Sequence, residues 1–356
     1  MQQANSGLTR VVLAAVASLA IVGCSTDRSG PAPNKAPSAN EIVQESKLSQ
    51  MPAFANVPWA DALKTEQDRL DRMGKPMSRY GSPAVPDFSG AFTTVKDAER
   101  RTLTLPCDCP EREIWWFGGS AAFGLGQRDD HTIASDLVTL AQKDGIKLKV
   151  RNLAVPGSTS TEEANWLERH LEVDKRSPDL VVFYDGFNDV LSSYMNAIVN
   201  RGELLDPVSF EGDFVGKYIA MVPPPDIDPK FIGPVVDHVV TAHRARRSEV
   251  VAAMGKRNVD VESFFQGDAF VSPLQASGLA KSLNTAMADI ADKSGLSQML
   301  RQTADRLEPE VHNLRPALET FDEPVFADPG HMNETGAQVM AERIYAVIGP
   351  RLHGSR

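Results

Sequence analysis

Positive charge is scarce in this sequence of 356 residues, which has 37 Lys and Arg against 47 Asp and Glu and a formal net charge of −10. A nucleic-acid-binding protein needs a clustered basic surface to neutralise phosphates, so the composition argues against that class and predicts no nucleic-acid partner. One short basic cluster is present, and it indicates the solvated face of a helix. It consists of His243, Arg244, Arg246 and Arg247.

Long apolar runs are also missing near the N-terminus, where the run at 11–22 is too short to span a bilayer. The run follows Arg10 and has the length of a signal-peptide core, which indicates export. It ends in Ile21-Val22-Gly23-Cys24, which resembles a bacterial lipobox, where a lipidated cysteine becomes the mature N-terminus. The resemblance implies a lipoprotein signal peptide over 1–23, a membrane anchor at Cys24 and a location in the cell envelope. The alternative is an ordinary signal peptide cut nearby.

Large apolar side chains are almost absent from residues 25–40, which are rich in Ser, Pro, Asn and Gly. Such a segment cannot bury a core. We therefore interpret residues 24–50 as a flexible tether. The whole chain, with 42% apolar residues, is long enough for one large globular domain with appendages.

Cysteine is rare, with three in the chain, so that an acylated Cys24 leaves only Cys107 and Cys109 in Pro-Cys-Asp-Cys-Pro. Export to an oxidising compartment favours a bridge between them. In an extended chain, however, their Cα atoms would be roughly 6.6 Å apart, near the upper limit for a disulfide. Free thiols and half of a metal site are the alternatives, although no other cysteine or nearby pair of histidines completes such a site. The pair stays unassigned, and we expect no metal.

Two patterns predict an N-terminal extension at 51–111. One is a set of residues at helical spacing that indicates a single amphipathic helix. Its members are Trp59, Ala62, Leu63, Leu70 and Met73. In the second pattern, at 91–105, β-forming side chains lie on both sides of the polar residues 96–99, which predicts a hairpin ahead of the main sheet.

From residue 113 onward strands alternate with helices, a pattern typical of a parallel sheet covered on both faces. Strands are expected at 114–117, 147–153, 178–184 and 259–265, with a weaker fifth near 311–317 or 324–327. Helices are expected at 132–145, from a capping box of Ser160 and Glu163 to about 173, and after Asn333. Residues 196–257 are interpreted as an insertion, helical at 235–255. The predicted fold class is α/β, with a parallel sheet of about five strands.

Polar candidates for a site follow the predicted strands at their carboxyl ends. Ser120 follows the first strand, Gly157 the second and Asn188 the third, whereas Asp328 and His331 precede the last helix. In an open parallel sheet, reactive groups gather in the loops at this edge. The sequence therefore predicts that these residues meet.

Four short blocks resemble the SGNH hydrolases, the GDSL-type esterases and lipases, in the order of that family. They are Gly118-Gly119-Ser120, Gly157, Gly186-Phe187-Asn188-Asp189 and Asp328-Pro329-Gly330-His331. The resemblance implies a three-layer α/β/α flavodoxin-like sandwich over 112–352 and cleavage of acyl esters without a cofactor. One position departs from the pattern, because the family usually has Asp where this chain has Gly119. This difference affects the expected subfamily and the local geometry next to Ser120 more than it affects the expected chemistry.

The chemistry of an acyl transfer assigns a role to each candidate. A serine hydroxyl is a poor nucleophile at neutral pH and needs a base, which in turn needs a third group to fix its tautomer. Ser120 is the candidate nucleophile, His331 the base and Asp328 the third group. The N–H groups of Ser120 and Gly157 and the side-chain amide of Asn188 are the candidate donors to the oxyanion.

Several other functions compete with this interpretation. The stretch Gly118-Gly119-Ser120-Ala121-Ala122 nearly matches the nucleophile elbow of α/β-hydrolases, although the acid and histidine here are only three residues apart. An inactive lipoprotein that only binds a ligand and an acyltransferase that uses the same triad are the remaining alternatives. Location in the envelope makes acylated glycans or lipids the expected substrates.

Overall fold

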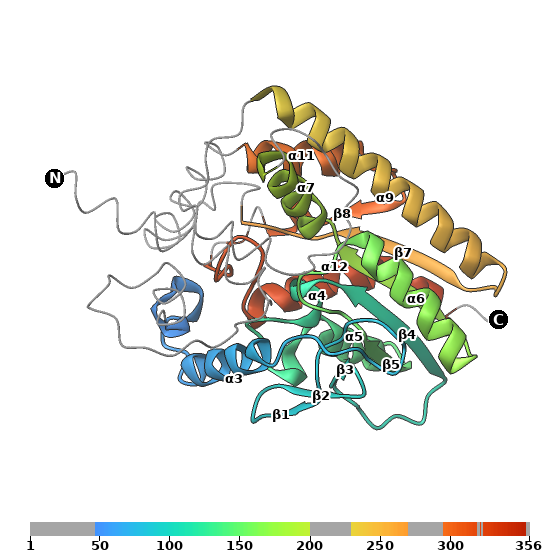
Figure 1. Ribbon diagram of the computed structural model, residues 1–356. Coiled ribbons are helices and arrows are strands. Elements are labelled where there is room, and N and C mark those ends of the chain that lie inside the picture. Colours follow the sequence, from blue (N-terminus) through green and yellow to red (C-terminus); the bar gives the residue numbers. More distant parts are fainter. Residues whose placement is uncertain (1–46, 200–228, 270–294, 319–320, 322, 354–356) are drawn as a thin grey trace.

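Eight strands form one sheet in the computed structural model of the protein, which describes residues 47–199, 229–269, 295–318, 321 and 323–353 (Figure 1). The strand order is β1-β2-β3-β5-β4-β6-β7-β8. Five neighbouring strands are parallel. They are β5 (Lys147–Asn152), β4 (Glu111–Gly118), β6 (Leu180–Asp185), β7 (Asp260–Phe265) and β8 (Val311–Asn313). In chain order they run second, first, third, fourth, fifth, which is the flavodoxin-like arrangement and confirms the predicted fold class.

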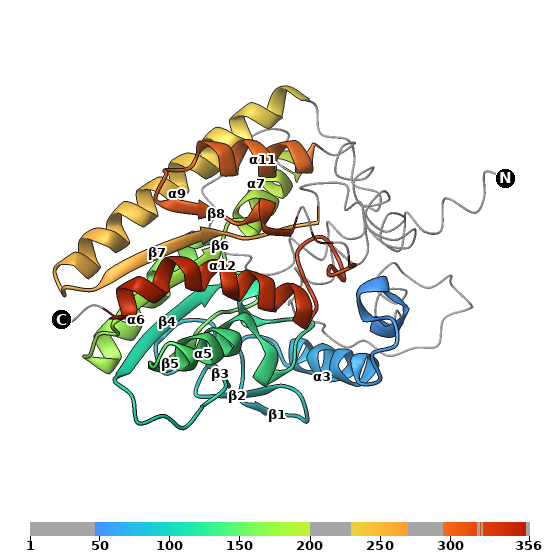
Figure 2. The same cartoon turned by 180° about the vertical axis from the view of Figure 1, so that it is seen from behind.

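Helices cover both faces of the sheet. Figure 1 shows α6 (Ser160–Asp174) and α9 (Ile232–Gly255) in front of the strands. The view from behind shows α5 (Ile133–Lys143) and α12 (Glu334–His353) on the other face (Figure 2). Two further helices, α7 (Phe187–Val199) and α11 (Leu296–Arg306), pack against α9. The side chains of residues 114–117 in β4 are therefore completely buried, as expected for a central strand between two helical layers.

The predicted hairpin at 91–105 is part of the main sheet. Strands β2 (Thr94–Lys96) and β3 (Glu99–Arg100) pair antiparallel, and β1 (Phe88–Ser89) extends them on the outside. Arg100 in β3 pairs with Asn152 in β5, which joins the extension to the parallel strands. The sheet therefore has three strands more than the five predicted.

The start of the described chain packs on the domain. Residues 47–50, which we had included in the predicted tether, contain the short helix η1 (Leu48–Gln50), where Ser49 binds Asp61 through its N–H at 2.8 Å and its hydroxyl at 2.8 Å. After η2 (Pro52–Phe54) comes α3 (Ala60–Arg72), the predicted amphipathic helix. Leu63 and Leu70 are buried as expected. Ala62 and Met73 are exposed, because only a narrow side of α3 contacts the domain.

Two details of the predicted elements were wrong, and the structure chooses between two alternatives for a third. The capping box of α6 consists of Thr159 and Glu162, one residue before the predicted pair, because the hydroxyl of Ser160 donates to Asp189 and Glu163 is buried. The fifth parallel strand is at 311–313, within the first of the two predicted alternatives, whereas residues 324–327 do not form a strand. The insertion has no boundary at 196, because α7 runs through that residue.

Cys107 and Cys109 are joined in a disulfide between β3 and β4. Their Cα atoms are 5.2 Å apart, which lies within the usual range for such bonds. A bend at Asp108 brings them closer than an extended chain would. The disulfide excludes the two alternatives left open by the sequence, which were free thiols and half of a metal site.

The expected signal peptide at 1–23, the lipidation site at Cys24 and the tether up to residue 46 lie outside the described residues. The same is true of residues 200–228 of the predicted insertion. Among the helices in the described ranges, none has an apolar stretch of the length needed to cross a membrane.

Candidate active site

Ser120 lies where β4 turns sharply into a helix of one turn, α4 (Ser120–Phe123). Gly118 makes the turn possible, because it has a φ of +151° and a Cβ atom there would lie 2.3 Å from the carbonyl oxygen of Tyr184. Ser120 is the first residue of α4 and is only 7% exposed. The turn therefore places one hydroxyl group at the carboxyl edge of the sheet.

The side chains of Ser120, His331 and Asp328 form one chain of hydrogen bonds. Nε2 of His331 is 2.6 Å from Oγ of Ser120. Nδ1 of the same ring is 2.8 Å from Oδ1 and 2.9 Å from Oδ2 of Asp328. A carboxylate can only accept, so Nδ1 carries the proton and Nε2 is left to accept the hydroxyl proton of Ser120.

The loop that carries His331 and Asp328 is held by its own hydrogen bonds. Oδ1 of Asp328 also accepts the N–H groups of Gly330 at 2.9 Å and His331 at 3.0 Å. The N–H of Ala327 donates to the carbonyl of His331 at 2.9 Å, so the loop closes on itself. These bonds fix the position of Asp328 before any substrate binds.

The three candidate oxyanion donors come from three segments that follow neighbouring strands: Ser120 begins α4, Gly157 lies in a turn after β5, and Asn188 lies at the start of α7. Within the described residues, the N–H groups of Ser120 and Gly157 donate no hydrogen bond. The side-chain amide of Asn188 donates one hydrogen to the carbonyl of Ser158 at 2.8 Å. An amide nitrogen carries two hydrogens, so a second one is left for a ligand.

Gly119 allows the amide of Asn188 to come close to the nucleophile. A Cβ atom at position 119 would lie 2.3 Å from Nδ2 of Asn188 and 3.5 Å from the carbonyl of Ser158. A side chain at position 119 would displace the amide of Asn188 from its observed position. The departure from the Gly-Asp-Ser pattern therefore has a local reason, which is the position of Asn188.

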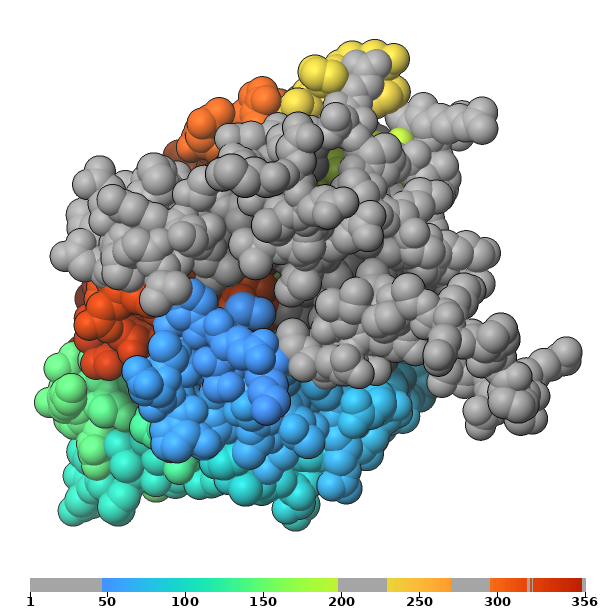
Figure 3. Space-filling model, turned by 90° about the vertical axis from the view of Figure 1, so that its left-hand side faces the viewer, coloured from blue at the N-terminus to red at the C-terminus, as the bar shows by residue number. Residues whose placement is uncertain are grey.

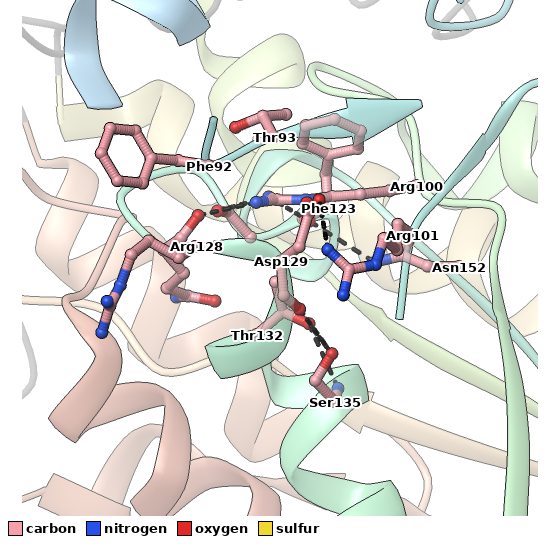
Figure 4. A network of polar contacts seen from close by, with 12 residues as sticks. Phe92, Thr93, Arg100, Arg101, Phe123, Arg128, Asp129, Thr132, Ser135 and Asn152 are labelled. Atoms are coloured by element: carbon pink, nitrogen blue, oxygen red, sulfur yellow. Dashed lines mark hydrogen bonds and ion pairs between the residues drawn. The ribbon is translucent and has the colours of Figure 1, made fainter. Parts of the chain in front are cut away.

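Arg100 holds the far end of α4 (Figure 4). Its Nη1 donates to the carbonyls of Phe123 at 2.8 Å and Gly124 at 2.7 Å, and its Nη2 donates to that of Gln127 at 2.6 Å. Its Nε binds Oδ1 of Asp129 at 3.1 Å, and both side chains are buried. A positive charge at the carboxyl end of a helix satisfies its free carbonyls. The hairpin strand β3 thus supports the turn that carries Ser120.

A buried acidic cluster lies behind the loops, where α6 and α7 begin. Asp189 accepts the N–H of Ser160 at 3.1 Å and its hydroxyl at 2.5 Å, and burial raises the pKa of Asp189 to about 6. Burial and the charges of Asp185 and Asp189 raise the pKa of Glu163 well above its usual range. His243 is also buried and lies 3.3 Å from Asp185, so it does not belong to a solvated basic face as predicted. Its hydrogen bonds link α6 to α7 through Ser160 and Asp189, and α9 to β6 through His243 and Asp185.

A pocket opens beside His331 and Asp328, and the N-terminal extension forms one of its walls. Its apolar lining includes Leu48, Met51, Leu70, Val85, Phe123 and Leu125. Three lysines also line it, at positions 47, 64 and 75. Figure 3 shows the face on which the first described residues, in blue, adjoin C-terminal residues, in red. Among the described residues, including those that line this pocket, no cluster of three or more His, Cys, Asp or Glu side chains has an arrangement suited to a metal ion.

No protein-family model matches the chain, and no curated protein matches its sequence. Among solved structures, it is similar to an acetyl xylan esterase at 15% identity, with 66% of this chain and 99% of that chain covered and a TM-score of 0.37. A member of the lipolytic G-D-S-L family from Veillonella parvula is 14% identical, with 67% and 98% covered and a TM-score of 0.40. A catalytic mutant of an acetylxylan esterase from Geobacillus stearothermophilus is 15% identical, with 71% and 100% covered and a TM-score of 0.38. Because these TM-scores are low, the function is inferred below from the side chains.

The structure links Ser120, His331 and Asp328 in one chain of hydrogen bonds, and it places Gly157 in a turn and Asn188 at the start of α7. Sequence reasoning missed Lys75 and Arg100, which come from the extension. Neither lies in a motif, and a single lysine or arginine carries no signal of its contacts. Only the fold shows that both reach the loops around Ser120.

Proposed function

We propose that this protein is a serine esterase of the SGNH (GDSL) type, which cleaves carboxylic esters through Ser120, His331 and Asp328. The observation that carries the proposal is the hydrogen-bond chain from Oγ of Ser120 through the ring of His331 to Asp328, with distances of 2.6 and 2.8 Å. A serine that served only to shape a turn would not need a histidine fixed in this tautomer.

The geometry supports a reaction in two halves. Oγ of Ser120 attacks the acyl carbon while Nε2 of His331 takes the hydroxyl proton. The tetrahedral intermediate collapses, its C–O bond to the leaving group breaks, and His331 returns the proton to the departing alcohol. A water molecule then attacks the acyl-enzyme with His331 again as the base. The acid is released and Ser120 regains its proton.

The oxyanion of each intermediate is stabilised by donors that are already in place. The free N–H groups of Ser120 and Gly157 and the second amide hydrogen of Asn188 supply three hydrogen bonds. Such preorganised donors are worth about 10²- to 10³-fold in kcat each. Asp328 stabilises the imidazolium form of His331 and keeps its ring in position.

Acyl transfer uses the same acyl-enzyme, with a sugar hydroxyl in place of water. The analysis of products in the presence of an envelope glycan separates the two reactions. A protein that only binds a ligand is the remaining alternative, and the intact hydrogen-bond chain at Ser120 argues against it.

Substrate class and location are also part of the proposal. An apolar pocket beside the triad fits an acyl chain, and the lipobox-like sequence before Cys24 supports attachment to a membrane. We propose an exported lipoprotein that acts on acylated glycans or lipids of the cell envelope. It needs no metal or other cofactor, so EDTA is expected to leave its activity unchanged.

The substitution Ser120→Ala tests the nucleophile. We expect it to abolish cleavage of a p-nitrophenyl acyl ester series, because it removes one hydroxyl and leaves the turn intact. A fluorophosphonate reagent should label the wild-type protein at Ser120 and fail to label the variant. Circular dichroism and the melting temperature serve as controls for folding. A folded variant with more than trace activity rules out Ser120 as the nucleophile.

A further inference from the structure

We propose that Lys75, on the N-terminal extension, is a positioning residue that holds the Pro156–Gly157 peptide with its N–H toward the oxyanion. The inference rests on the proposed esterase function, because it assigns the N–H of Gly157 to the oxyanion site. It explains why a segment outside the parallel sheet reaches the loops around Ser120.

Lys75 contacts this peptide directly. Its ammonium group donates a short hydrogen bond to the carbonyl oxygen of Pro156. A Cβ atom built on Gly157 would lie 3.4 Å from the same Nζ atom. Lys75 also lines the pocket that contains His331 and Asp328. The ammonium group is therefore next to the peptide unit that carries the second oxyanion donor.

The turn that contains this peptide has two possible forms. The N–H of Ser158 donates to the carbonyl of Val155 at 3.1 Å, so Pro156 and Gly157 are the two central residues of a β-turn. Gly157 has a φ of +85°, the value that a type II turn needs at this position. The central peptide of a type I turn has the opposite orientation, and glycine accepts either sign of φ.

A flip between these forms keeps the Ser158 to Val155 hydrogen bond but reverses the peptide of Pro156 and Gly157. The N–H of Gly157 would then point away from the oxyanion. Proline at the first central position suits both turn types, so the local sequence does not choose between them. The hydrogen bond from Lys75 to the carbonyl of Pro156 exists only in the observed orientation, which it therefore stabilises.

The positive charge of Lys75 has a second effect on the same peptide. The carbonyl and the N–H are conjugated, so a cation at the oxygen withdraws electron density from the nitrogen. Hydrogen bonds in such a chain strengthen one another, which makes the N–H of Gly157 a better donor. Burial lowers the pKa of Lys75, whereas the carboxylates of Glu162 and Asp71 oppose that shift and favour its charged form.

The test compares Lys75→Met with Lys75→Arg and with the control Lys96→Met. Lys96 is an exposed lysine of the same extension, in β2, and is not among the residues that line the pocket. Removal of one oxyanion donor costs about 10²-fold or more in kcat. Lys75→Met leaves the N–H of Gly157 in the protein and only releases its orientation, so we expect it to lower kcat by about 10-fold, with KM within twofold of the wild type. The rate of fluorophosphonate labelling should fall in parallel. Lys75→Arg should recover most of both rates, and Lys96→Met should leave them unchanged.

The outcomes separate this inference from the proposed function. A wild-type protein that neither cleaves esters nor reacts with the fluorophosphonate contradicts the proposed function itself. An active wild type with unchanged kcat in Lys75→Met overturns only the role of Lys75. A rise in KM alone also overturns it, since Lys75 would then bind substrate. If Lys75→Met has a lower melting temperature, the comparison is made with Lys75→Leu, which also lacks a hydrogen-bond donor, and an unchanged kcat in that variant is likewise contradictory.

Discussion

Gly119 is the residue at which this chain departs from the family pattern, and the structure relates that departure to Asn188. The space that a side chain at 119 would occupy is filled by the amide of Asn188. That amide donates one hydrogen to the carbonyl of Ser158, which leaves its second hydrogen for a ligand. Glycine at this position therefore leaves the amide of Asn188 in the place where we propose that it donates to the oxyanion.

We expect Gly119→Ala to lower kcat by about 10²-fold with little change in KM, as for loss of one oxyanion donor. The new Cβ atom would lie 2.3 Å from Nδ2 of Asn188 and would push the amide away. Steady-state kinetics on a short acyl ester measure the effect. Gly233→Ala is the matched control, because no atom lies within 4 Å of its added Cβ atom. Wild-type kcat in a folded Gly119→Ala protein contradicts this role of the glycine.

Single residues could be predicted from the sequence where they belong to a short motif at a strand end. Ser120, Asn188 and His331 were identified in this way, because parallel strands place their carboxyl ends at one edge. Lys75 could not be predicted, since its contact with Pro156 depends on how the segment after α3 packs against a turn 81 residues later in the chain. The missed residues support the loops around the site and do not lie in its motifs.

At the scale of elements, the predictions succeeded where apolar periodicity is strong. The parallel strands and the helix at 133–143 match the predicted ranges within a few residues. The weak fifth strand was ambiguous because β8 contains only three residues. The capping box was displaced by one position, since the motif at 159–163 offers two acceptable pairs and tertiary contacts choose between them. Because Ser160 and Glu163 are buried, the capping box is formed by Thr159 and Glu162.

The hairpin β2–β3 was predicted as an addition to the sheet, and it also supports the nucleophile turn through Arg100. We expect Arg100→Met to lower the free energy of unfolding by about 3–5 kcal/mol, as for removal of one partner of a buried ion pair. The change leaves the buried carboxylate of Asp129 and the carbonyls of Phe123 and Gly124 without the guanidinium. Urea unfolding followed by circular dichroism measures the loss.

Arg101→Met is the matched control for this experiment. Arg101 is the next residue; it pairs with Asp130 at 3.0 Å and lies 3.8 Å from Asp129, but its side chain is 54% exposed. An exposed ion pair contributes at most about 1 kcal/mol. If both variants lose the same amount of unfolding free energy, the buried network of Arg100 does not stabilise the domain. The double variant Arg100→Met with Asp129→Asn should lose less than the sum of the two single changes, because the two side chains interact.

For the whole molecule, the position of the first described residues relates the active site to the proposed anchor. Lys47 and Leu48 line the same pocket as His331. About 23 residues separate Cys24 from Lys47. The composition of this segment predicts a flexible coil, with a reach of roughly 25 Å. A lipid on Cys24 would therefore keep the mouth of the pocket near the membrane surface, where acylated glycans and lipids are concentrated.

We expect wild-type protein expressed with its leader to partition with membranes and Cys24→Ala to be lost from them. Lipidation of such a cysteine adds a diacylglycerol and an N-acyl chain, and durable anchoring requires more than one chain. Mass spectrometry of the mature N-terminus measures the modification directly, and Ser29→Ala, which changes the same segment, should partition like the wild type. Ester cleavage per mole of purified protein should be equal in all three proteins, because neither Cys24 nor Ser29 is among the residues proposed for catalysis. An unmodified terminus at a residue other than Cys24 rules out the anchor and the location, and leaves the esterase proposal intact.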